Sequence, residues 1–497
     1  MESWNHIINT ALLGTDKRML KKEDIVSDLS EDFDLIASQT QNKEDLFLQT
    51  AALMYNYRQC GFVPMHKETV SILQAEEEVK AYVNPLAQQV LYDIIEAGSI
   101  SLLQFWLEKC VSAKRIVQPE LIPVLLDGGM RHKSIQSLVY DCCGKRGAWL
   151  MQFNDDWKHI DPLPDEELWQ TGSLEQRKNI LLQLRKNSPA KGRGLLQQIW
   201  VEENAAAKAE LVQQLAINAG EEDLPFLEDL LNEKSVRVKD EAIKILKKIP
   251  SSSIVQLYWR LLKPAIGIKK EKALLGLSSK MVLETLPIKE VDEFIYKTGL
   301  EKMSSEKNVS DQNFLLYQLI MSVPPSFFER HLNLGKEEIL KSLLHHSLGK
   351  NFLPAFGLAA IRFNELEWLR AVTAQEESQL YIGAFQVLPQ KEAEQYAIRH
   401  LEKESHAADI INRISNFANE WSIDLAKTVL KFTAKNSYQY NKGFYNQIIH
   451  LLPIPIVGEL EKCTPKEEHL RTMWSNTSEH INRMLTLKLQ AFKAFNE

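Results

Sequence analysis

The chain has 497 residues, of which 44% are hydrophobic, and a formal net charge of −7 at pH 7. No stretch approaches the ~20 consecutive apolar residues of a membrane-spanning helix, so the sequence predicts no membrane segment. The acidic balance disfavours a general nucleic-acid-binding protein, because such proteins neutralise phosphates with an excess of lysine and arginine.

The N-terminal residues are polar and mixed in charge, without the basic patch and apolar core of a secretory signal, so we expect a cytoplasmic protein. A first helix carries Trp4 and Ile7 on its apolar face and ends at Gly14, which suits a left-handed helix cap. A second helix is expected over residues 44–60. From Pro85, segments that open with proline or serine continue the helical pattern, and we assign 1–160 to an N-terminal helical region.

The five cysteines are scattered, and none shows metal-ligand spacing or a CxxC pair, so we expect inert buried thiols. His345 and His346 are adjacent, so on a helix their side chains point about 100° apart and do not chelate one ion. The chain has no HExxH, Walker A, GxSxG or GxGxxG pattern. We therefore predict a protein that is not an enzyme and that has no metal site and no cofactor.

The stretch from Gly144 to Trp157, GKRGAWLMQFNDDW, has an unusual composition. One interpretation is a polar site, in which Arg146 acts with the aspartates near the end of the stretch. The other is structural: Trp149 and Trp157 supply apolar surface that seals the junction with the helices that follow. The helical spacing of the aromatic residues favours the structural interpretation.

A repeat with a period of 31 residues follows. Four basic residues and four leucines recur at this interval: Arg177, Lys208, Lys239 and Lys270, and Leu184, Leu215, Leu246 and Leu277. The preceding helices share a register in the same way: Leu168, Ile199, Leu230 and Leu261, followed by Trp169, Trp200, Leu231 and Leu262. Two short amphipathic helices per unit cannot bury their apolar faces alone, so neighbouring units must stack. This pattern predicts an α-solenoid of HEAT-like repeats.

Three motifs also carry a resemblance to a known family: ALLGTDKR at 11–18, GKRGAWL with NDDW at 144–157, and KSVRVKDEAIKILKKIPSSS at 234–253. With them, the chain resembles a bacterial family of uncharacterised HEAT-like helical-repeat proteins. The resemblance implies a place beside a MoxR-type AAA+ ATPase, a von Willebrand factor A domain protein and a SWIM zinc-finger protein, which members commonly have as genomic neighbours. It supplies no catalytic residue, and it marks Arg146, Trp149 and Trp157 as family-motif residues.

The remainder of the chain reads as helical but irregular in spacing. Residues 281–298 continue the helical pattern, and Ser304 to Asp311 break it, which predicts a linker or long loop. The predicted fold is all-α: an α-solenoid of HEAT-like helical hairpins, regular in the middle and degenerate at both ends. We expect regular repeats at 161–300 and degenerate helical repeats at 301–497.

A basic segment is the first candidate for a binding surface. Residues 234–272 hold eleven basic and three acidic residues, a net charge of +8 in an acidic chain. The candidate patch comprises Arg237, Lys244, Lys248 and Lys270. A structural alternative pairs basic residues with the acid six positions earlier, Glu202 with Lys208 and Glu233 with Lys239, and assigns the rest to a solvated helix face. The sequence favours this alternative, since the chain has no net basic charge.

Two functions follow from these observations. The favoured one is a non-catalytic scaffold or adaptor that binds a protein partner, such as the AAA+ ATPase or von Willebrand factor A protein implied by the resemblance. The other is a nucleic-acid-binding protein or HEAT-like DNA glycosylase with a basic concave face. The second requires Trp169, Trp200 or Trp259 to face a groove with the lysines, yet two of these occupy the apolar register of the repeat, which predicts core positions.

Overall fold

The computed structural model describes residues 2–60, 74–157, 165–272, 279–375, 378–403 and 406–496. These residues are mostly helical, as predicted, and the chain divides into two compact units, Met1–Gln74 and Ala75–Glu497. This division falls inside the predicted N-terminal region, and the three-part division of the sequence stays a prediction. Leu277 lies outside the described residues.

Unit 1 is a small helical cluster of α1 (Glu2–Leu13), α2 (Ser30–Gln39) and α3 (Lys43–Cys60). Gly14 has φ of 84°, which confirms the left-handed end predicted for the first helix. Among the residues of this unit that the structure describes, the buried side chains of its core are those of Ile7, Leu20, Ile25, Leu29, Phe33 and Met54.

Unit 2 begins with four helices: α4 (Pro85–Ala97), α5 (Ile100–Ser112), α6 (Ile122–Arg131) and α7 (Gln136–Met151). Helix α5 packs on α4, and α7 packs on both α5 and α6. The carboxamide of Asn84 accepts a hydrogen bond from the backbone of α4, and Gly98 ends that helix with φ of 68°. Proline at the start and glycine at the end therefore have the roles that the sequence predicted.

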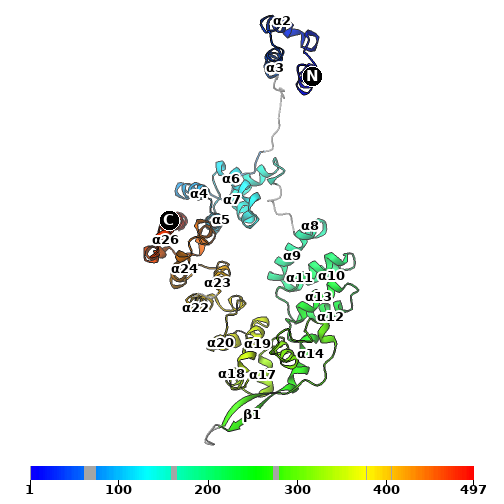
Figure 1. Cartoon of the computed structure of the whole chain (residues 1–497), viewed down its shortest axis with the longest axis vertical. Helices are drawn as coiled ribbons and strands as arrows, with labels where there is room; N and C mark the ends of the chain where they lie inside the picture. Colours follow the sequence, from blue (N-terminus) through cyan, green and yellow to red (C-terminus); the bar gives the residue numbers. More distant parts are fainter. Residues whose placement is uncertain are drawn as a thin grey trace. The chain divides into compact units, whose positions relative to one another are not determined.

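Three helix pairs follow at the predicted interval: α8 (Asp165–Thr171) with α9 (Leu174–Asn187), α10 (Pro189–Ile199) with α11 (Ala205–Gln214), and α12 (Leu224–Asp229), extended by a 3-10 turn, with α13 (Val236–Leu246). The second helices of the pairs pack side by side, α9 on α11 and α11 on α13 (Figure 1). Leu215 and Leu246 are fully buried between them, so the repeated leucines do stack neighbouring units.

The fourth predicted unit is wrong in its second half. Its first helix is present as α14 (Ser253–Leu262), but an antiparallel hairpin of β1 (Ile266–Lys272) and β2 (Ser279–Thr285) replaces the second helix and the start of the segment predicted to be helical from residue 281. Ile266 and Ile268 flank Gly267, and a β-branched alternation around a glycine favours a strand over a helix. Lys270 shares the period of the repeat and yet lies opposite Met281 in the hairpin.

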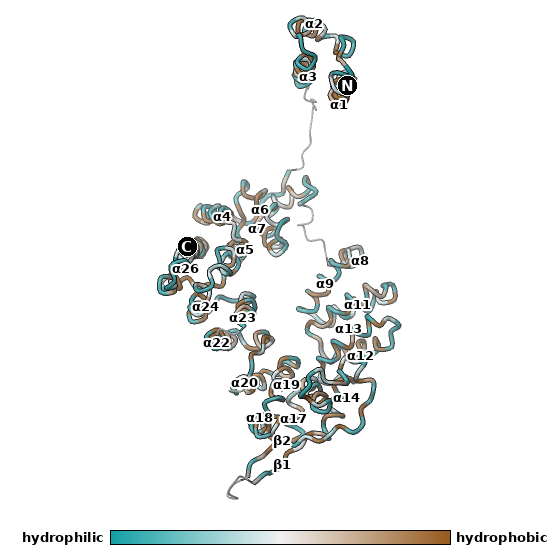
Figure 2. The backbone as a smooth tube through the Cα atoms, in the orientation of Figure 1, coloured by the Kyte–Doolittle hydropathy of each residue, from teal (hydrophilic) through white to brown (hydrophobic). Residues whose placement is uncertain are grey.

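The C-terminal part of unit 2 is an irregular series of helices: α15 (Phe294–Lys297), α16 (Asp311–Ile320), α17 (Ser326–Leu332), α18 (Lys336–Leu344), α19 (Gly349–Arg362), α20 (Leu366–Thr373), α21 (Ala384–Val387), α22 (Gln390–Leu401), α23 (Ala407–Ile414), α24 (Ile423–Lys435), α25 (Lys442–Ile448) and α26 (Glu468–Asn496). Figure 2 shows hydrophobic and hydrophilic residues alternating along these helices, as helices with one buried face require. Among the residues that the structure describes, no helix combines the length and apolar character of a membrane span.

The last helix of unit 2 packs along α4 and α5, at the beginning of the same unit (Figure 1). The ring centroids of Trp106 and Phe495 lie 5.2 Å apart, edge to face, and the Asn84 side chain donates a hydrogen bond of 2.8 Å to the backbone oxygen of Ala494. In a linear repeat array each unit contacts only its neighbours in sequence. Contact between α26 and the first helices of the unit departs from that pattern.

Candidate functional site

The candidate basic patch is divided between elements. Arg237 and Lys244 lie two turns apart on α13 and are exposed, with side-chain exposures of 59% and 67%. Glu210 on α11 lies 3.5 Å from Arg237 and 3.4 Å from Lys178 on α9, so it bridges three neighbouring second helices. Lys244 pairs with Glu241 at 2.7 Å on its own helix. Both candidate cations on α13 therefore have acidic partners.

The other two candidates lie elsewhere. Lys248 is exposed in the turn after α13, and Lys270 is exposed on β1. The four residues thus belong to a helix, a turn and a strand, and the period that grouped Lys270 with the repeat no longer places it on a shared helix face.

The basic residues of the repeat pair with acids, but not with those predicted. Lys208 lies 3.5 Å from Glu233 of the following unit, and Arg177 pairs with Glu203 in the same way. Glu233 also accepts a hydrogen bond of 2.9 Å from the Trp200 indole, and this bond, with Lys208, lowers the pKa of Glu233 despite its partial burial. A basic side chain near the start of α9 or α11 thus contacts an acid in the turn before the second helix of the following pair.

Arg237→Ala tests whether this surface ion pair contributes to stability. We expect the free energy of unfolding to change by no more than about 0.5 kcal/mol, because an exposed pair gains little in high dielectric. Thermal and urea denaturation measure the change. A loss above about 1.5 kcal/mol would contradict the interpretation of Arg237 as a solvated, weakly paired residue.

Arg146 and Trp149 lie on α7 just after a kink at Gly144, and Trp157 lies beyond the end of that helix. Gly144 has φ of 61°, and the Glu78 carboxylate occupies the space that a Cβ atom would fill, while the Arg146 backbone N–H donates to the same carboxylate at 2.8 Å. The Trp149 ring contacts Phe153 edge to face. The Trp157 indole donates to Asp127 on α6 at 2.9 Å. These contacts fix α7 against neighbouring segments.

Four of the five thiols have the environment of structural cysteines, whereas Cys60, at the end of α3, is exposed, so the expectation of a buried thiol is wrong for Cys60. Cys110, Cys142, Cys143 and Cys463 are buried, and burial, with nearby acidic groups, raises the pKa of Cys143. A raised pKa keeps a thiol protonated and unreactive. In the described part of the chain, no group of three or more histidine, cysteine or acidic side chains is arranged to hold a metal ion.

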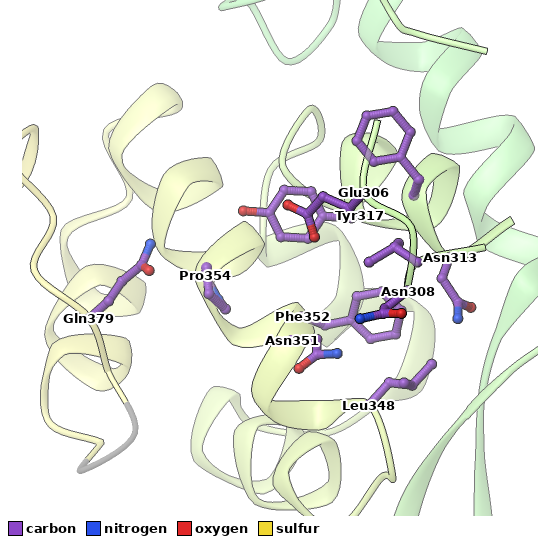
Figure 3. A pocket seen from close by; sticks show the side chains of 11 residues that line it. Glu306, Asn308, Asn313, Tyr317, Leu348, Asn351, Phe352, Pro354 and Gln379 are labelled. Carbon is purple, nitrogen blue, oxygen red and sulfur yellow. The ribbon is translucent and has the colours of Figure 1, made fainter. Parts of the chain in front are cut away.

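One candidate for a binding site is a cavity of about 420 Å³ between α16, α19 and the irregular segment before α16 (Figure 3). We call it the amide cavity. Phe314 and Tyr317 from α16 and Phe352 and Pro354 from α19 provide its apolar surface. Its volume lies in the range of small-molecule and peptide pockets, roughly 300–1,000 Å³.

Polar groups of one kind surround this cavity: the carboxamides of Asn308, Asn313, Asn351 and Gln379. Within the described residues none of these carboxamides has a hydrogen-bond partner, and Figure 3 shows Gln379 on a segment at the opposite end from Asn313. Glu306 adds a carboxylate beside the Tyr317 ring. Burial, and to a smaller extent Glu306, raise the pKa of Tyr317, so its hydroxyl stays a neutral donor.

The sequence predicted only a linker or long loop at Ser304 to Asp311. The segment is irregular, and Ser310 caps α16 by accepting a hydrogen bond from the backbone of Asn313. The segment also forms one wall of the amide cavity, through Glu306, Asn308 and Val309. The four carboxamides are spread over residues 308 to 379, so no short sequence motif predicts this site.

The model of a family of unknown function, DUF5691, matches residues 6–495. The chain belongs to this family. No curated protein and no solved structure matches the chain. The family match therefore covers both units and brings no assigned activity with it.

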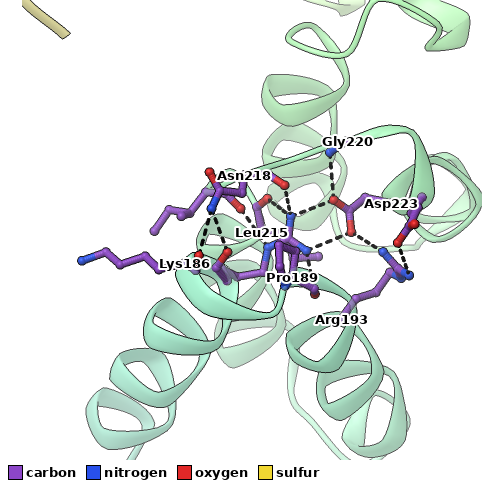
Figure 4. Close-up of polar contacts among 10 residues, drawn as sticks. Lys186, Pro189, Arg193, Leu215, Asn218, Gly220 and Asp223 are labelled. Atoms are coloured by element: carbon purple, nitrogen blue, oxygen red, sulfur yellow. Dashed lines mark hydrogen bonds and ion pairs between the residues drawn. The ribbon is translucent and has the colours of Figure 1, made fainter. Parts of the chain in front are cut away.

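In this DUF5691 protein, a buried ion-pair network joins α9, α10 and the segment between α11 and α12 (Figure 4). Arg185 on α9 is fully buried and donates to both carboxylate oxygens of Asp223, at 3.0 and 2.7 Å. It also donates to four backbone carbonyls, those of Pro189, Leu215, Ile217 and Asn218. Asp223 accepts further hydrogen bonds from Arg193 and from the Gly220 N–H. Every side-chain nitrogen of Arg185 and both carboxylate oxygens of Asp223 are hydrogen-bonded within the protein, so this buried pair holds the fold together and offers no free group to a ligand.

Lys488 on α26 forms a second buried contact of this kind. Its side chain is 2% exposed, and its ammonium group donates to Glu420 at 2.6 Å and to the backbone oxygens of His450 and Leu452 at 2.8 and 2.7 Å. Burial lowers the pKa of Lys488, and Glu420 partly opposes that effect. All three ammonium hydrogens have acceptors, so we assign Lys488 a structural role.

Proposed function

We propose that the protein is a non-catalytic scaffold of HEAT-like helical repeats that binds an extended segment of a partner protein in the amide cavity. One observation carries the proposal: four carboxamides without partners among the described residues surround an open apolar cavity. A carboxamide has two donors and an acceptor, so it can pair with both the N–H and the C=O of a peptide backbone.

The other walls of the cavity fit the same ligand. Phe314, Tyr317 and Phe352 offer flat apolar surface for side chains of the segment, and Glu306 offers a partner for one basic side chain. The family resemblance suggests that the segment belongs to a MoxR-type AAA+ ATPase or a von Willebrand factor A protein. Nucleic acid is disfavoured at this cavity, because its one charged side chain is acidic.

Affinity capture from the native cell tests the proposal. The wild-type chain should retain a stoichiometric protein partner, and Asn308→Ala/Asn351→Ala should weaken binding of that partner about tenfold or more. Two backbone-directed hydrogen bonds at about 1 kcal/mol each give a change of this size. Titration of the purified partner measures it.

Asn412→Ala, which removes an exposed carboxamide from α23, is the matched control and should leave the affinity unchanged. Equal capture by the wild type and the double variant would contradict the assignment of the cavity. Recovery of nucleic acid that is lost in high salt, with no stoichiometric protein, would contradict the scaffold function itself.

A further inference from the structure

A separate cavity of about 270 Å³ lies between α14 and α17. We call it the Trp259 cavity, and its lining comprises Gln256, Trp259, Lys263, Phe327, Arg330 and His331. Gln256 and Trp259 lie on α14, and Lys263 begins the 3-10 turn that directly follows it. Their spacing of three and four positions places all three on the same side of this segment. The three on α17 close the other side. None of these residues belongs to the amide cavity or to the candidate basic patch.

Aromatic contacts hold the walls in place. The Trp259 ring lies 5.5 Å from Phe327 and 5.7 Å from His331, in both cases edge to face. The Arg330 guanidinium stacks over Phe327 at 4.6 Å from the ring centroid. A guanidinium fixed by a ring loses less freedom when its N–H groups bind a ligand. His331 Nε2 lies 3.1 Å from the backbone oxygen of Ile266, which also fixes that ring.

The charge of the cavity is positive. No carboxylate lines it, and within the described residues Lys263 and Arg330 have no ion-pair partner. Two acids of this region have other hydrogen-bond partners: Glu329 accepts from the Trp368 indole at 2.6 Å, and Glu365 accepts from Ser326. Arg330 also acts electrostatically on Glu365, where it partly opposes the rise in pKa that burial causes. The Trp259 indole N–H likewise has no hydrogen-bond partner among the described residues. The cavity therefore presents two cations and an additional donor.

We propose that the Trp259 cavity binds a phosphate monoester. A phosphate monoester carries close to two negative charges at neutral pH, which match one cation from the turn after α14 and one from α17. The planar guanidinium pairs with two phosphate oxygens, and the lysine ammonium acts as a point charge on the third. The indole N–H and the ring surface beside it suit a sugar or base attached to the phosphate.

Isothermal titration calorimetry of the full chain tests this site, with adenosine 5′-monophosphate, ribose 5-phosphate and adenosine as probes. Both phosphate esters should bind and adenosine should not. Tighter binding of the nucleotide identifies a base as part of the ligand, and equal binding identifies the phosphate and sugar alone; each result supports the site. No binding of either ester, or equal binding of adenosine, overturns the proposal.

Variants locate the binding. Arg330→Ala and Lys263→Ala should each weaken binding of the phosphate ester about tenfold or more. The affinity of Arg330→Lys should lie between those of the wild type and Arg330→Ala, because lysine keeps the charge and loses the planar guanidinium. Arg260→Ala is the control: Arg260 is an exposed cation on α14 that lines a different cavity. An equal loss in Arg260→Ala would show diffuse attraction to a basic surface and would overturn the site. This outcome is independent of the capture experiment on the amide cavity.

Discussion

Arg185→Ala should lower the free energy of unfolding of unit 2 by about 3–5 kcal/mol, the range found when one partner of a buried ion pair is removed. The substitution leaves the Asp223 carboxylate inside the protein with one of its two arginine partners. It also leaves the carbonyls of Leu215 and Asn218 without the donor that they share. Urea denaturation measures the loss, and hydrogen exchange over α9–α11 shows where the structure loosens.

Lys186→Ala is the matched control for this loss. Lys186 is the next residue on α9, and its side chain is exposed. It contributes to the network only through its backbone oxygen, which accepts a hydrogen bond from the Asn218 side chain. We expect its stability to stay within about 0.5 kcal/mol of wild type. If Arg185→Ala were no less stable than Lys186→Ala, the network would not hold α9 to α10 and to the segment between α11 and α12.

The same network makes the stability of the fold depend on pH. Burial alone would raise the pKa of Asp223, but the hydrogen bonds from Arg185, Arg193 and Gly220 outweigh burial and hold the pKa below its usual value. A carboxyl whose pKa is lower in the folded state stabilises the fold at neutral pH. That stabilisation is lost as the pH falls below about 4 and through the folded-state pKa. Asp223→Asn should lack this component of the acid sensitivity.

The 31-residue period predicted buried positions correctly in units in which both helices form. The register of Leu215 and Leu246 predicted buried positions in neighbouring second helices, and both are fully buried. The same register predicted a helix at Lys270, where β-branched residues around Gly267 form a strand instead. Spacing alone does not distinguish these cases, because the first helix, α14, is present in either fold.

Contacts between distant parts of the chain were not predictable from the sequence. Glu233 was expected to pair within its own unit and pairs with Lys208 of the preceding one, because stacked helices bring the start of one near the turn of the next. Neither the amide cavity nor the Trp259 cavity has a sequence motif. Lys263 follows α14 and Arg330 lies on α17, and these two segments meet although the hairpin, α15 and α16 separate them in the chain.

Lys488→Met should lower the free energy of unfolding by about 2–4 kcal/mol, since two buried carbonyls lose their donor at about 1–2 kcal/mol each. Methionine keeps the volume of the lysine stem, so the change reports the ammonium contacts and not a cavity. These contacts join α26 to the backbone at His450 and Leu452. Denaturation compared with Lys493→Met, an exposed lysine on the same helix, measures the effect.

The position of α26 gives this substitution a second readout. The helix packs along α4 and α5, and the Lys488 ammonium lies 5.7 Å from the centroid of the Phe105 ring on α5. If α26 loosens, amides of α4 and α5 should exchange hydrogen faster, although they lie near the opposite end of the sequence. Exchange in α4 and α5 that matched the Lys493→Met control would show that Lys488 fixes only the local turns. Faster exchange would show that one buried ammonium group helps to hold the first and last helices of unit 2 together.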